Sequence, residues 1–80
     1  MTNREKFRAA YLEKLTEAHA KHPEEYAYPA EGIPVVVDKM IIALAAGTAS
    51  NSGAIKAVCR KLGIKSTYGA IKAYLADGAA

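Results

Sequence analysis

The chain has 80 residues, 51% of them hydrophobic, and a formal net charge of +3. This length indicates one domain with a small core, because a chain of this size buries only about 60–65% of its unfolded surface. The hydrophobic content excludes a disordered polyelectrolyte, and no apolar run reaches the roughly 20 residues of a membrane-spanning helix. No secretory hydrophobic segment follows Met1, and the lone cysteine rules out an internal disulfide, so we expect a cytoplasmic protein.

The N-terminal part predicts an amphipathic helix over residues 3–21. Thr2 and Glu5 have the spacing of a capping box at its start. Apolar side chains then recur at helical spacing, at Phe7, Tyr11, Leu15 and Ala18. Pro23 ends this helix, and residues 22–33, which contain two prolines and a glycine, are expected to form a linker.

Residues 34–46 predict a second helix that is apolar on nearly every side. Pro34 fits the first turn, and Gly47 fits the position just past the end. A helix of this kind must be covered by other elements or by a partner, so we expect the rest of the chain to pack around it. The residues expected to be mostly buried are Met40, Ile41 and Leu44.

Two further helices are predicted over residues 52–62 and 66–76. The third helix has a core stripe at Ile55, Val58, Cys59 and Leu62. Gly63 is the expected left-handed residue after its end, and Ile64 can fold back on Cys59 to close the cap. The fourth helix can be capped by Ser66 or Thr67, with inward-facing residues expected at Tyr68, Ile71 and Leu75. Residues 77–80 are expected to be a frayed tail.

These patterns predict an all-α fold, a small four-helix domain whose residues 34–76 form a three-helical unit. A helix, a short turn at Gly63 and a second helix that opens with a cap are the pattern of a helix-turn-helix. With Cys59 at the small position and Ile64 after the turn, residues 40–75 resemble the three-helical DNA-binding domains of resolvases, small terminase subunits and bacterial repressors. Tyr68 stands where those families usually have Val or Ile. The resemblance implies DNA binding by this helix pair.

Positive charge is concentrated in the C-terminal third. Residues 1–31 carry five basic and six acidic side chains, whereas residues 53–80 carry five basic side chains against Asp77 alone, a local excess of four. This excess favours a polyanionic partner, although a solvated basic face needs no partner. The side chains expected to contact nucleic acid are Lys56, Arg60, Lys61, Lys65, Ser66, Thr67 and Lys72.

The predicted function is a small regulatory DNA-binding protein of helix-turn-helix type that acts as a dimer. Its sequence specificity should be weak, because the small residues on the outer face of the last helix cannot read base edges. The rival hypothesis is a phage- or plasmid-type accessory protein that binds a cellular protein and no nucleic acid. Tyr26 and Tyr28 in the linker would then form a recognition surface, although the small size of the core favours a role as pegs that close it. Gly69 and Ala73 would let a partner helix lie close.

No catalytic, metal or cofactor site is predicted. His19 and His22 lie one turn apart and precede two glutamates, a spacing that could hold a metal. A histidine near the C-terminus of a helix also complements the helix dipole, which needs no metal. Cys59 lies on the apolar stripe and is expected to be a small buried hydrophobe rather than a nucleophile. An enzyme is therefore not expected.

Overall fold

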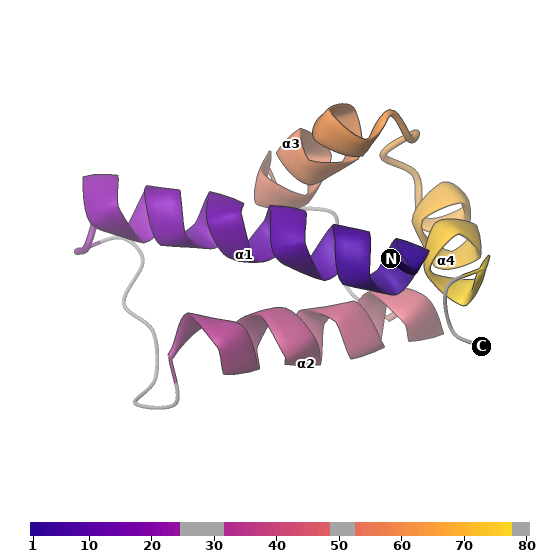
Figure 1. Ribbon diagram of the computed structural model, residues 1–80, viewed down its shortest axis with the longest axis horizontal. Coiled ribbons are helices and arrows are strands. Elements are labelled where there is room, and N and C mark those ends of the chain that lie inside the picture. The colour runs from indigo at the N-terminus through magenta and orange to yellow at the C-terminus, as the bar shows by residue number, and fades with distance from the viewer. Residues whose placement is uncertain (25–31, 49–52, 78–80) are drawn as a thin grey trace.

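Four helices make up the described part of the computed structural model, which covers residues 1–24, 32–48 and 53–77 (Figure 1). The helices are α1 (Asn3–Lys21), α2 (Ile33–Ala46), α3 (Gly53–Leu62) and α4 (Tyr68–Asp77). No strand occurs within these ranges. The predicted all-α, four-helix fold is confirmed, and the observed bounds differ from the predicted ones by at most two residues. No helix in the described ranges is long and apolar enough to cross a membrane.

The ends of the helices follow the local sequence signals. At the start of α1 the Glu5 amide donates to Oγ1 of Thr2 over 3.1 Å, and the Thr2 amide donates to a Glu5 carboxylate oxygen over 3.1 Å. This reciprocal pair is the predicted capping box, and the hydrogen bond from the Thr2 backbone lowers the pKa of Glu5. Both α2 and α3 end at a glycine with positive φ, 76° at Gly47 and 74° at Gly63. The amide of Ile64 donates to the carbonyl of Cys59 over 3.0 Å, as the sequence predicted.

Helix α1 is the element against which the other three pack. α2 runs along one side of α1, α3 lies on another side, and α4 crosses near its N-terminal end (Figure 1). At that crossing the Asn3 side-chain amide donates to the carbonyl of Tyr74 over 3.1 Å. α2 packs against α1 and α4. The expectation that the second helix would be the centre of the fold is therefore wrong.

Helix α2 is covered on one face only. Val37, Ile41 and Leu44 are buried, Met40 is half-buried, and Ile42 is 65% exposed. Burial of Ile41 and Leu44 agrees with the sequence prediction, but cover on every side does not. A domain this small has too few helices to surround one of its own, and exposed apolar side chains are common on protein surfaces.

The core draws side chains from all four helices. The buried residues of the described chain are Phe7, Ala10, Tyr11, Leu15, Val37, Ile41, Leu44, Ile55, Val58, Cys59, Ile71 and Leu75. The rings of Phe7 and Tyr11 meet edge to face, with their centroids 6.1 Å apart. Apolar periodicity thus located the core-facing stripes of α1, α3 and most of α4.

Tyr68 is the exception to this agreement. The sequence predicted that it faces inward, but 53% of its surface is exposed, whereas Ile71 and Leu75 are fully buried. Thr67 caps α4, since its Oγ1 accepts from the amide of Ala70 over 3.2 Å, and Tyr68 is the first helical residue. The apolar stripe of α4 therefore extends one residue past the core, and that residue is Tyr68.

Candidate nucleic-acid interface

A shallow basic depression lies between α3 and the start of α4. We call it the basic depression, and its volume is about 490 Å³. The residues that line it are Lys56, Cys59, Arg60, Ile64, Lys65, Ser66 and Thr67. It brings together five of the seven residues predicted to contact nucleic acid, and none of the described residues that line it carries a carboxylate.

The fold positions these side chains through the two faces of α3 and the turn that follows. Lys56 and Arg60 are four residues apart, so they lie on one face of α3, opposite the apolar face that packs on α1. The left-handed conformation of Gly63 turns the chain back at the end of α3. Half-buried Ile64 then anchors the turn on the core, and Lys65 follows it. The depression is therefore built by the turn as much as by the helix.

The three cations of the basic depression have no compensating acid. Lys56, Arg60 and Lys65 are exposed and form no ion pair with a described residue. Elsewhere, three cations pair with carboxylates of the described chain: Arg8 with Asp38, Lys21 with Glu17, and Lys61 with Glu13. The positive charge of the depression is thus available to an anion, whereas much of the charge on α1 is matched within the protein.

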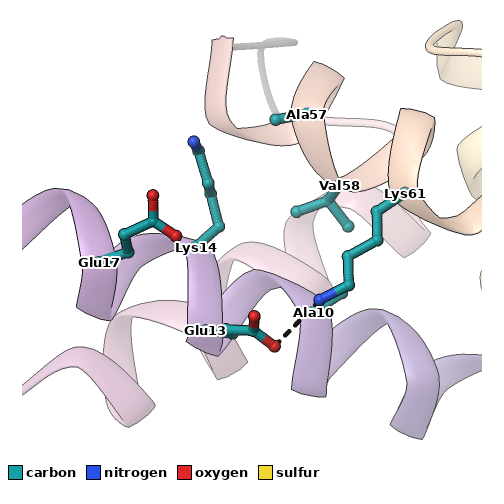
Figure 2. A pocket seen from close by; sticks show the side chains of 7 residues that line it. All are labelled: Ala10, Glu13, Lys14, Glu17, Ala57, Val58 and Lys61. Carbon is teal, nitrogen blue, oxygen red and sulfur yellow. Dashed lines mark hydrogen bonds and ion pairs between the residues drawn. The ribbon is translucent and has the colours of Figure 1, made fainter.

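Lys61 and Lys72, which the sequence grouped with the depression, lie elsewhere. Nζ of Lys61 lies 3.0 Å from a carboxylate oxygen of Glu13, across the interface of α3 and α1 (Figure 2). The side chain of Lys72 approaches the C-terminal end of α2, where its Cδ lies 4.0 Å from the place of a Cβ on Gly47. Lys72 is therefore near the end of α2 and does not line the basic depression.

A second, smaller groove separates α1 from α3 (Figure 2). Its volume is about 200 Å³, and its lining residues are Ala10, Glu13, Lys14, Glu17, Ala57, Val58 and Lys61. Charges of both signs surround it. The hydrogen bond from Lys21 lowers the pKa of Glu17, so this carboxylate stays charged to lower pH than usual. The groove is a less suitable anion site than the basic depression, since its two glutamates repel a phosphate.

The residues of the rival hypothesis are only partly described. Gly69 and Ala73 are exposed on α4, and a Cβ added at Gly69 would meet nothing within 4 Å. The small-residue stripe is therefore open to solvent. Tyr26 and Tyr28 lie outside the described residues.

The two histidines lie at the end of α1, and the cysteine lies in the core. Within the described ranges no group of three His, Cys, Asp or Glu side chains is arranged to hold a metal. His19 and His22 lie at the C-terminal end of α1, where the amide of His22 donates to the carbonyl of Ala18 over 2.9 Å. Cys59 is 1% exposed, as predicted, and burial raises the pKa of its thiol. A raised pKa leaves little of the reactive thiolate at neutral pH.

Sequence reasoning missed that Tyr68, which follows Thr67 of the basic depression, is a surface residue. Its position directly after the capping Thr67 was the available signal, because a residue at the first position of a short helix can lie beyond the core. The chain matches no protein-family model, no curated protein and no solved structure. The function is therefore inferred from the arrangement of this chain's own residues.

Proposed function

We propose that this protein binds DNA through the helix-turn-helix-like pair α3–α4, with the basic depression on the phosphate backbone. The observation that carries the proposal is the convergence of Lys56, Arg60 and Lys65 on one surface whose described lining contains no carboxylate. Lysine and arginine are the usual donors to phosphate oxygens, and hydroxyl groups such as that of Thr67 also donate to them. An acid-free cluster of donors matches a chain of phosphates.

The proposal includes weak sequence specificity. Base edges are read mainly by Arg, Asn, Gln and acidic side chains that reach them from a helix or strand. The exposed face of α4 offers Gly69, Ala73 and Ala76 instead, and Lys72 extends toward Gly47. Such a protein should bind many sequences with similar affinity, as expected for contacts that are mostly to the backbone.

The salt dependence of duplex DNA binding tests the proposal. Each phosphate contact contributes about 0.9 unit to the slope of log affinity against log salt, so three contacts give about 2.7 units. We expect the double variant Arg60→Ala, Lys65→Ala to flatten the slope by about 1.8 units. Lys6→Ala with Lys39→Ala is the matched control: it removes two exposed cations outside the depression and should leave the slope unchanged.

The same measurement separates the alternatives. A dimer that presents two depressions to one duplex would give a slope of about 5.4 units, twice that of the monomer. A protein that retains no duplex or single-stranded DNA at low salt does not bind DNA. If Ala73→Glu then breaks a complex with a cellular protein, the accessory-protein hypothesis replaces the present one.

A further inference from the structure

Tyr68 carries an exposed aromatic ring and directly follows Thr67, the last residue that lines the basic depression. It is 53% exposed, whereas the other described aromatic residues, Phe7, Tyr11 and Tyr74, are buried or half-buried. Thr67, its neighbour in the chain, lines the depression. Exposed apolar side chains are common, as at Ile42, so the position of Tyr68 next to the depression, rather than its exposure alone, points to a binding role.

We propose that the basic depression and Tyr68 together bind single-stranded nucleic acid in preference to duplex. This inference rests on the proposed function, because it takes the depression as the phosphate site. Proteins that bind single strands combine a positively charged groove along the backbone with aromatic rings on which the bases stack. Lys56, Arg60 and Lys65 supply the first element, and Tyr68 supplies the second.

The peptide bond keeps the backbone of Tyr68 next to the depression. The Cα atoms of Thr67 and Tyr68 are about 3.8 Å apart, as in any trans peptide. Thr67 lines the depression, and Tyr68 follows it at the first position of α4 with its ring exposed. The proposal requires this ring to reach a nucleotide that adjoins a phosphate held between Arg60 and Lys65.

A duplex cannot use Tyr68 in the same way. Its bases are already stacked on one another, so a protein ring reaches a base face only by unstacking a step, at a cost of a few kcal/mol. Apart from Lys72, which lies near Gly47, the described outer face of α4 has no side chain of the kind that reads the major groove. Phosphate contacts remain possible with a duplex, but only a single strand can engage the exposed ring as well.

The test measures the affinity of the full chain for three probes at low salt. They are a short oligothymidylate, an abasic single strand of the same length and a duplex of the same length. Wild-type protein should bind oligothymidylate most tightly. Tyr68→Ala should weaken that binding roughly 5- to 100-fold, the effect expected for one lost base stack, and should leave binding of the abasic strand unchanged.

Two variants control for the loss of an exposed apolar side chain. Tyr68→Phe keeps the ring and should retain binding, whereas Ile42→Ala removes an exposed side chain from α2 and should not change the affinity for any probe. An oligouridylate of the same length shows whether the preferred single strand is DNA or RNA, and tight binding of either supports the proposal.

Three outcomes overturn the inference. Equal binding of duplex and oligothymidylate, with no effect of Tyr68→Ala, removes the preference for single strands but leaves backbone binding by the depression intact. Equal weakening of oligothymidylate and abasic binding by Tyr68→Ala shows that the ring does not stack on a base. Failure to bind any probe at low salt removes the proposed function and the inference together.

Discussion

The two faces of α3 have opposite surroundings, although they alternate along ten consecutive residues. Ile55, Val58 and Cys59 are buried on the side of α1. Lys56 and Arg60 are exposed on the side that lines the basic depression. The spacing of apolar residues decides which face is covered. The placement of carboxylates decides which of the remaining cations stay available, because Glu13 pairs with Lys61 and no acid of the described ranges pairs with Lys56 or Arg60. Stability and binding should therefore respond to substitutions on different faces.

The largest expected effect is on the buried face. Ile55→Ala should lower the free energy of unfolding by about 2–5 kcal/mol, because it leaves a cavity in the core. Lys56→Ala, one residue along, should change it by no more than about 0.5 kcal/mol. Urea unfolding followed by circular dichroism measures both. Similar losses in the two variants would contradict the division of α3 into a packing face and a binding face.

The second largest effect is expected at the turn between α3 and α4. Gly63→Ala places a Cβ on a residue with a φ of 74°, which should cost about 1–2 kcal/mol and should also weaken DNA binding by displacing Lys65. Gly69→Ala is the control, since this residue is helical and has open space around it; we expect a gain of about 0.5–1 kcal/mol. Thermal melts and DNA titrations of both variants test the pair. A neutral Gly63→Ala would mean that the turn adapts without strain.

Neighbouring cations on α3 sharpen the comparison further. Lys56→Ala should flatten the salt slope of duplex binding by about 0.9 unit, whereas Lys61→Ala should leave it unchanged, because Lys61 already pairs with Glu13. Equal flattening by both substitutions would show that Lys61 leaves Glu13 on binding and that the interface extends to α1.

The smallest effect expected concerns acid. Hydrogen bonds from Thr2 and Arg8 hold the pKa of Glu5 below 4.5 and that of Asp38 below 3.8, their ordinary values. A depressed pKa gives stability that is complete above the unfolded value and is lost as the pH falls through the folded value. Unfolding should therefore become slightly easier below about pH 4.5, and Asp38→Asn should reduce that loss. Urea midpoints of both proteins across this range provide the measurement.

Much of the fold could be predicted from the sequence because its signals are local. The capping box at Thr2, the glycine after α3 and the buried stripe of α3 each depend on residues within a few positions of one another. Which helix lies at the centre depends on how helices pair, and no local pattern records that. α2 was expected at the centre for its apolar composition, yet α1 contacts all the other helices.

Only part of the candidate interface could be predicted, because some of its contacts join residues that are far apart in the chain. The sequence showed the charges of Lys56, Arg60 and Lys65 but not the acid that pairs with Lys61, which lies 48 residues away in the chain. It also gave no sign that Lys72 extends toward Gly47. Successive positions of a helix point about 100° apart, so the adjacent side chains of Arg60 and Lys61 lie on different surfaces.

The central place of α1 also bears on how the chain folds. Phe7, Ala10, Tyr11 and Leu15 precede their core partners on α3 and α4 in the chain, so they are synthesised before them. Part of the apolar stripe of α1 therefore stays uncovered during synthesis until α3 and α4 have been made. Loop-closure entropy then has to be overcome before these distant contacts stabilise the fold, so we expect folding to be slower than for a bundle of sequential hairpins. A fragment that begins at α2 would lack the surface on which α3 packs, and we expect it to remain unfolded.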